Sequence, residues 1–293
     1  MTQAHPAGDA IRDIFIGIKD SSSRRDWLTS LPPRKRSELE FHDRVRTPGA
    51  EKLPTDTFEA LHSNKKFYSV VRDSQGYVED WIRRNVPGKI FLDYACGNGA
   101  NTLQAARLGA RIAIGLELSS VSIANAEEAA RAAGVAEKCI FIQGDCENTG
   151  IPADSVDVII CSGMLHHLDL SYAFPELRRI LKPGGVVLAI EALDYNPAIK
   201  AYRLLTPSMR TAWETVHILS LKDLVFAERF FDLGEVRFWH LAAIAAVAFR
   251  RFPSVFESIL AILSSFDRIA LRIPGLRLLA WQITFELKKR VEG

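Results

Sequence analysis

The sequence predicts an α/β protein built on one mostly parallel sheet with helices on both faces. Three observations predict it. From residue 89 short apolar segments alternate with helical segments, a glycine-rich loop follows the first apolar segment, and acidic residues stand where several apolar segments end. The 293 residues, 48% hydrophobic and 25% charged, can form one large domain or two small ones with ample core.

Residues 1–63 are expected to form an amino-terminal helical arm. Ile11 to Ile18 and Ser37 to Val45 have the apolar spacing of short amphipathic helices, and Ser37 has Glu40 three residues on, as in a capping box. The basic run Arg34-Lys35-Arg36 is compatible with phosphate binding, but the acidic residues that follow favour a solvated helix face. We expect the arm to cover part of an active site or to lie loosely on the surface.

The core is expected over residues 64–240. Thr55 to His62 and Gly76 to Val86 have helical spacing and precede the first expected strand. The expected strands are Ile90 to Asp93, Arg111 to Leu116, Cys139 to Gln143, Val156 to Cys161 and Val186 to Glu191. The expected helices between them are Asn101 to Leu108, Ser119 to Ala133 and Leu170 to Leu181, and Pro183-Gly184-Gly185 is expected to turn the chain into the fifth strand.

The carboxyl-terminal part should complete the sheet. Leu221 to Phe230 is expected as a helix and Gly234 to His240 as a sixth strand. Residues 281–293 are expected to hold the last strand, because apolar and polar residues alternate from Trp281 to Lys288. Residues 241–280 between these two strands are apolar and helical. They could form a lid, a dimer surface or an amphipathic membrane patch with nearby arginines, although the composition favours a packed helical cap.

The run Asp93-Tyr94-Ala95-Cys96-Gly97-Asn98-Gly99 combines a strand end, an acid and a tight loop before a helix, which is a cradle for a polar ligand. The order D-x-x-C-G-x-G resembles motif I of the class I S-adenosylmethionine (SAM) methyltransferases. The resemblance implies a Rossmann-like sheet with an antiparallel last strand, SAM as cofactor, and a loop that wraps its methionine half. Ala95 stands where that family usually has glycine, and a dinucleotide pattern fits poorly because its third glycine would fall at Thr102.

Two further acids end the next two expected strands. Glu117 can accept hydrogen bonds from both ribose hydroxyls, and Asp145 can accept the adenine amine, with backbone groups of Leu118 or Cys146 completing adenine recognition. In the methyltransferase family an aromatic residue before motif I often touches the cofactor, which makes Tyr68 a candidate, although an aromatic side chain here can equally belong to the core.

The segment after the fourth strand, from Ser162 to Leu168, resembles a loop of the ubiquinone/menaquinone methyltransferase group, and Ser162 would lie near the cofactor. His166, His167 or Glu191 could position the acceptor or take its proton, with His166 preferred, although a histidine could also only tie down the loop. A metal site is not expected, because no third ligand stands at useful spacing. A polar stretch further on could bind substrate or form a buried ion-pair network such as Arg210–Glu214; its candidates are Tyr195, Arg203, Arg210 and His217.

The predicted function is SAM-dependent methyl transfer to a small natural-product, sugar or lipid-like acceptor, with oxygen slightly favoured. The alternatives are a non-catalytic SAM-binding partner subunit and a nicotinamide-dependent oxidoreductase. With 37 basic and 35 acidic residues, the charge does not indicate a nucleic-acid partner. The four cysteines form no C-x-x-C pair, no signal peptide is recognised, and the longest apolar run has nine residues where a spanning helix needs about 20, so a cytoplasmic protein, either monomeric or homodimeric, is expected.

Overall fold

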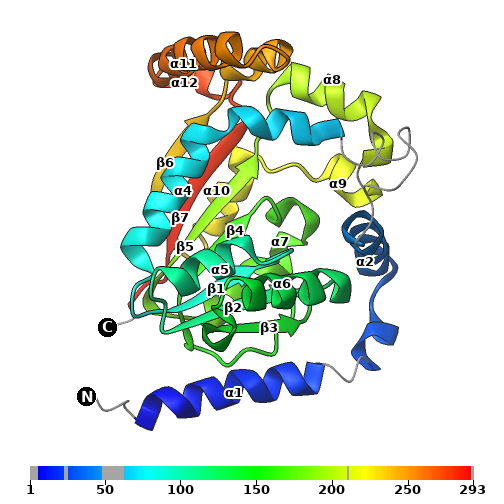
Figure 1. Cartoon of the computed structure of the whole chain (residues 1–293), viewed down its shortest axis with the longest axis vertical. Helices are drawn as coiled ribbons and strands as arrows, with labels where there is room; N and C mark the ends of the chain where they lie inside the picture. Colours follow the sequence, from blue (N-terminus) through cyan, green and yellow to red (C-terminus); the bar gives the residue numbers. More distant parts are fainter. Residues whose placement is uncertain (1–5, 23–25, 48–62, 210, 292–293) are drawn as a thin grey trace.

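The computed structural model describes residues 6–22, 26–47, 63–209 and 211–291. Within them, the centre is a seven-stranded sheet in the order β3-β2-β1-β4-β5-β7-β6 (Figure 1). The first five strands run parallel, and β7 is antiparallel to both β5 and β6, which confirms the predicted fold class. The strands span Ile90–Tyr94 (β1), Ile112–Glu117 (β2), Cys139–Gln143 (β3), Val156–Ser162 (β4), Leu181–Ala192 (β5), Asp232–Trp239 (β6) and Gln282–Lys288 (β7).

Both faces of the sheet are covered, because neighbouring residues of each strand point to opposite sides. Ile90 and Leu92 of β1 belong to one apolar cluster, and Phe91 belongs to the other. The helices that contribute to the first cluster are α1 (Pro6–Ser22), α7 (Leu170–Ile180) and α10 (Leu221–Ala227). Those that contribute to the second are α4 (Arg72–Asn85), α5 (Ala100–Arg107) and α6 (Ser120–Ala132).

The predicted fifth strand begins earlier than the sequence suggested. Leu181–Ala192 is one strand, so Pro183-Gly184-Gly185 lies within β5 rather than in a separate turn. Gly184 has a positive φ of 75°, and the pairing of β4 with β5 shifts register between Val156 and Val158. The proline–glycine run therefore makes an irregular start to the strand.

The amino-terminal arm consists of α1, the 3-10 helix η1 (Asp26–Ser30) and α2 (Pro33–Arg46). In Figure 1, α1 lies at the end of the molecule opposite α11 (Pro253–Ala270). Phe15 of α1 is fully buried. The expected capping box at Ser37 is wrong: α2 begins four residues earlier, with Pro33 in its first turn and Pro32 as the N-cap residue without a side-chain cap. The predicted helix over Thr55 to His62 lies outside the described residues.

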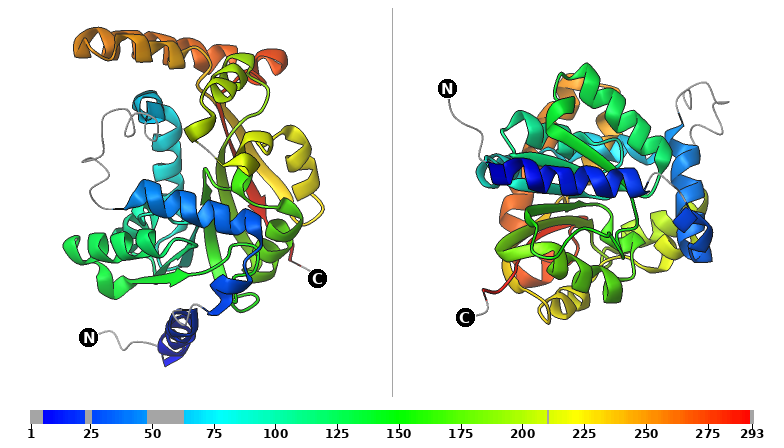
Figure 2. Two further views of the ribbon diagram at one scale, coloured as in Figure 1. Left: turned by 90° about the vertical axis from the view of Figure 1, so that its right-hand side faces the viewer. Right: turned by 90° about the horizontal axis from the view of Figure 1, so that it is seen from below.

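Helix α11 lies at one end of the molecule and projects beyond its body (Figure 2). Among the residues that the structure describes, no helix has the length and apolar character to cross a membrane. The connecting helices are η3 (Ser63–Val70), η4 (Ala136–Lys138), η5 (Leu165–His167), α8 (Pro197–Leu205), η6 (Pro207–Met209) and α9 (Ala212–Val216). Between β6 and β7 lie η7 (Ala243–Phe249), α11 (Pro253–Ala270) and α12 (Pro274–Arg277).

Candidate functional site

The carboxyl ends of β1 and β2 are joined through Glu117, whose carboxylate accepts hydrogen bonds from two backbone N–H groups. Gly97 N lies 2.9 Å from one carboxylate oxygen and Ser119 N lies 2.9 Å from the other. Glu117 is only 4% exposed. The loop after β1 and the helix start after β2 are therefore both fixed relative to this carboxylate.

The carboxylate of Asp93 contacts the first turn of α5, the helix that follows the loop. This carboxylate accepts hydrogen bonds from the Thr102 backbone N–H at 3.1 Å and from the Thr102 hydroxyl at 3.0 Å. Burial raises the pKa of Asp93 to about 6, although the bonds from Thr102 and Asn101 oppose the shift. Asp93 thus connects the end of β1 to the first turn of α5 and fixes the two ends of the loop between them.

The loop between β1 and α5 requires unusual backbone conformations. Ala95, Gly97 and Gly99 have positive φ values of 59°, 53° and 80°. For Gly99 the missing side chain also matters for packing, because an added Cβ would lie 2.9 Å from the Cβ of Ala126. Ala95 holds the left-handed conformation despite its methyl group, which costs about 1–2 kcal/mol relative to an ordinary conformation.

Helix α2 covers this loop with positively charged side chains. The Arg46 guanidinium lies 3.1 Å from Glu117, and Lys35 forms an ion pair with Asp145, the acid that follows β3. Arg34 binds Glu147 at 2.6 Å. The prediction that Arg34-Lys35-Arg36 forms a solvated face is wrong for Arg34 and Lys35, because their partners lie on the core about 110 residues later in the sequence.

A cavity of about 110 Å³ lies between α2 and the ends of the first four strands. Seven residues proposed for the site from sequence line it: Ala95, Glu117, Leu118, Asp145, Cys146, Ser162 and His167. Five more come from the arm and were not predicted: Arg34, Lys35, Glu38, His42 and Arg46. Four of these recur every fourth residue, from Arg34 to Arg46, so they share one helix face. This repeat of polar residues at four-residue spacing was the sequence feature that pointed to a continuous polar face on the helix.

His166 and Glu191 form a tightly held pair at the end of β5. His166 Nδ1 lies 2.6 Å from a Glu191 oxygen, and the other Glu191 oxygen accepts hydrogen bonds from the backbone N–H groups of Met164 and Leu165 at 2.8 and 2.7 Å. Glu191 is 1% exposed. On the other side of the ring, His166 Nε2 lies 3.9 Å from Glu214.

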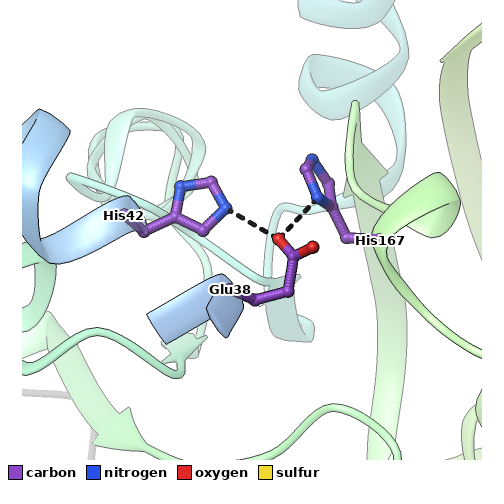
Figure 3. Close-up of side chains that lie close together, drawn as sticks. All are labelled: Glu38, His42 and His167. Carbon is purple, nitrogen blue, oxygen red and sulfur yellow. Dashed lines mark hydrogen bonds and ion pairs between the residues drawn. The ribbon is translucent and has the colours of Figure 1, made fainter. Parts of the chain in front are cut away.

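His167 takes part in a second cluster, with two residues of α2 (Figure 3). A single oxygen of Glu38 lies 2.9 Å from His167 Nδ1 and 3.7 Å from His42 Nε2. Burial opposes the charge on both partners, but the Glu38–His167 interaction outweighs it, lowering the pKa of Glu38 and, with help from Glu214, raising that of His167. Burial, aided by the charge of Arg46, lowers the pKa of His42 to about 3.

The other predicted residues within the described part of the chain do not line this cavity. Tyr68 is 53% exposed and packs edge-on against Trp281. Arg203 binds Glu214 at 3.2 Å, and the Tyr195 hydroxyl accepts a hydrogen bond from Leu221 N. His217 is exposed and stacks on Trp213. Arg210, and with it the predicted Arg210–Glu214 pair, lies outside the described residues.

Comparison with known proteins agrees with this architecture. Residues 92–189, about a third of the chain, match the family model described as a methyltransferase domain. A ribosomal protein L11 methyltransferase of Pasteurella multocida is 24% identical over 174 residues, 58% of this chain and 56% of the relative. A sterol 24-C-methyltransferase of Gibberella zeae is 29% identical over 112 residues, 37% of this chain and 30% of the relative. The chain spans a little more than half the length of the L11 methyltransferases that it matches.

Solved structures show the same fold. A geranyl diphosphate C-methyltransferase from Streptomyces coelicolor A3(2), solved with Mg²⁺, geranyl diphosphate and S-adenosyl-L-homocysteine, superposes with a TM-score of 0.59 at 14% identity, covering 89% of this chain and 99% of that one. The cyclase SpnF gives a TM-score of 0.51 at 19% identity, covering 74% and 81%. These likenesses confirm the class I methyltransferase fold, and the presence of a cyclase among them shows that the fold alone does not set the reaction.

Proposed function

We propose that this chain is a SAM-dependent methyltransferase acting on a small molecule. The methyltransferase domain match over residues 92–189 and the fold support the enzyme class and the cofactor. The proposal includes that the enzyme is similar to the ubiquinone/menaquinone methyltransferase group, which the loop from Ser162 to Leu168 resembles. A protein acceptor is the main competing choice, because the L11 methyltransferases are among the chain's relatives.

One observation carries the proposal: the acids expected to bind the adenosine half of SAM converge on one cavity. Glu117 and Asp145 both line it, together with Leu118 and Cys146, which would flank the adenine. Both carboxylates already bind cations, as Arg46 and Lys35 show, and are therefore placed as acceptors. Ser162 and the loop from Ala95 to Gly99 would border the methionine half, with Asp93 supporting that loop from behind.

The small size of the cavity means that part of the protein must move before a cofactor can bind. Its volume of about 110 Å³ is well below the ~300–1,000 Å³ of typical small-molecule sites. Arg46 and Lys35 occupy the two acids in this structure. Helix α2, or at least these two side chains, must shift before a cofactor reaches Glu117 and Asp145.

SAM, when bound, supplies a methyl group on a positively charged sulfur. Alignment of the acceptor with that group can lower the barrier by about 7–11 kcal/mol. Glu191 holds His166 by Nδ1, so a neutral His166 keeps its lone pair on Nε2 and can take a proton from the acceptor. In this proposal His166 is the base, Glu191 fixes its tautomer, and Tyr195, Arg203, Arg210 and His217 contribute to the acceptor side.

The helices between β6 and β7 favour a lipid-like acceptor. One stripe of α11 and its flanks is apolar and exposed, with Phe252, Ile262, Phe266, Ile269 and Ile273 each more than half exposed. Residues 241–280 contain five arginines against Glu257 and Asp267. An apolar stripe flanked by positive charge fits an anionic membrane surface, which we propose as the partner of this region.

Vesicle flotation tests the membrane contact. The chain should float with anionic vesicles and much less with zwitterionic ones, and a Phe266→Ser/Ile269→Ser variant should stay at the bottom of the gradient. If the wild type floats with neither, and light scattering shows a dimer that this variant lacks, the stripe is a dimer surface instead.

The function is tested by calorimetric titration with SAM and S-adenosylhomocysteine. Glu117→Ala should abolish binding, whereas Glu128→Ala, an exposed acid of α6, should leave it unchanged. Binding of NAD in place of SAM would favour the oxidoreductase. With radiolabelled SAM and a cell extract, label in small molecules supports the proposal, label in protein favours a protein acceptor, and binding without any transfer favours a partner subunit.

A further inference from the structure

Glu38, His42 and His167 bring three metal-binding atoms to one point beside the cofactor cavity. Glu38 and His42 are four residues apart, so they project from the same side of α2, and His167 comes from η5 of the core (Figure 3). The three ligand atoms lie within 4.8 Å of one another. This group could not be recognised from the sequence, because 125 residues separate His42 from His167.

The distances suit a single ion. Two ligands bound to one tetrahedral ion at ~2.1 Å are about 3.4 Å apart. The Glu38 oxygen lies 2.9 Å from His167 Nδ1 and 3.7 Å from His42 Nε2, which brackets that value. Small side-chain shifts therefore suffice to make the three atoms equidistant from a common centre.

The surroundings hold the ligands in place, as is usual around metal ligands. The second oxygen of Glu38 accepts a hydrogen bond from the Thr211 hydroxyl, and the main-chain oxygen of His167 accepts one from Arg34 at 2.9 Å. A neighbouring group of His166, His167 and Glu214 suits an ion less well, because Glu214 already binds Arg203 and His166 Nδ1 is held by Glu191.

We propose that Glu38, His42 and His167 bind one first-row transition-metal ion of the Zn²⁺ type, with a coordination position open to the cavity. Two imidazoles and one carboxylate suit such ions, whereas Mg²⁺ prefers an all-oxygen shell. All three residues line the cavity that Glu117 and Asp145 also line. Since two ligands belong to α2 and one to the core, the ion also links α2 to the core, while the Lys35 and Arg46 side chains stay free to leave Asp145 and Glu117.

The role of the ion in catalysis rests on the proposed function. A hydroxyl group of the acceptor would fill the open position, where a Lewis acid makes it more acidic. His166, whose ring centroid lies 4.3 Å from that of His167, takes the hydroxyl proton. The oxygen then forms a bond to the methyl carbon of SAM, and the carbon–sulfur bond breaks with its electron pair left on sulfur.

Metal binding is tested without cofactor or acceptor, so its failure is separate from failure of the proposed function. Chelator-treated full-length protein is titrated with Co²⁺, followed by its visible absorption, and with Zn²⁺ in competition. We expect one ion per chain, and we expect Glu38→Gln, His42→Ala and His167→Ala each to weaken binding at least 100-fold. Glu40→Gln, an exposed residue of the same helix, should bind as the wild type does.

A second measurement guards against misfolded variants. Added Zn²⁺ should slow hydrogen exchange of the α2 amides in the wild type and not in His42→Ala, while circular dichroism verifies that both are folded. Absence of stoichiometric binding to the wild type, or equal binding by the wild type and the three variants, overturns the proposal whatever the SAM titration gives.

Discussion

Helices α2 and α11 both lie outside the sheet, yet they are attached to the rest of the molecule by opposite means. The face of α2 that meets the core is polar, and its one buried residue is Glu38; the helix is held by ion pairs to Glu117 and Asp145. By contrast, α11 buries Phe256 and Leu260 and leaves a second apolar stripe exposed. Ion pairs weaken with salt and can be exchanged for a ligand's polar groups, whereas apolar contacts are lost only with the fold. The comparison assigns movement to α2 and a fixed platform to α11.

The largest expected effect concerns the attachment of α11. Phe256→Ala should lower the free energy of unfolding by about 3–5 kcal/mol, because it empties a buried site. Phe266→Ala in the same helix, where the ring is 54% exposed, should change it by less than about 0.5 kcal/mol. Denaturant unfolding measures both. Similar losses in the two variants would show that the exposed stripe is covered in solution.

The next expected effect is a pH dependence of the free energy of unfolding that arises at His240, the residue after β6. Burial lowers the pKa of His240 to about 4, so the folded protein keeps it neutral while the unfolded chain binds a proton below the ordinary value of 6.5. Its contribution to stability is therefore present above pH 6.5 and falls by about 1.4 kcal/mol per pH unit as the pH drops toward 4. His240→Asn, which tolerates the positive φ of 63° at this position, should remove that slope. Identical slopes for the two proteins in unfolding titrations would contradict the assignment.

A third effect addresses the attachment of α2. Since Lys35 and Arg46 occupy the acids proposed for the cofactor, the Lys35→Ala/Arg46→Ala variant should bind S-adenosylhomocysteine about tenfold more tightly, equivalent to about 1.4 kcal/mol. Arg44→Ala, an exposed residue of the same helix, serves as the control. Calorimetry at low and high salt should show the difference shrinking as salt rises. Weaker binding by the double variant would mean that α2 closes over the cofactor and contacts it.

The smallest expected effect concerns the backbone of the loop between β1 and α5, which α2 covers. Ala95→Gly should raise the free energy of unfolding by about 0.5–1 kcal/mol, because glycine adopts a φ of 59° without strain and only part of that gain is offset by its freedom in the unfolded chain. Ala153→Gly, in an exposed turn, should instead lower stability slightly. Thermal unfolding of the two variants measures the difference. Equal losses of stability would contradict backbone strain at Ala95.

Most of the core could be predicted from the sequence, because its signals are local. Each strand is a short apolar run, and Glu117 and Asp145 directly follow or end such runs, so the meeting of their side chains at one edge follows from the parallel order. The strand β7 was recognisable from its apolar/polar alternation, whereas its antiparallel direction was implied by the resemblance to the methyltransferases. The start of α2 was misplaced because Ser37 and Glu40 mimic a cap, while Pro32 and Pro33 mark the real beginning.

The polar face of the arm could not be predicted in the same way. A charged residue on a helix carries no local mark of whether it faces water or a distant acid, and the partners of Lys35 and Arg46 are 110 and 71 residues away. For the same reason the sequence indicated His166 and His167 but not Glu38 or His42, and it gave no ground for expecting a metal ion.

The order of strands in the sheet has a consequence for synthesis of the protein. Because β7 lies between β5 and β6, the sixth strand has no neighbour to pair with until the seventh has been made. While the ribosome adds the stretch from Trp239 to Gln282, at roughly 5–20 residues per second, β6 and the apolar helices that follow it must wait with their backbone and side chains uncovered. The newborn chain is therefore most vulnerable to aggregation, and most dependent on a chaperone, in the last seconds before β7 closes the sheet.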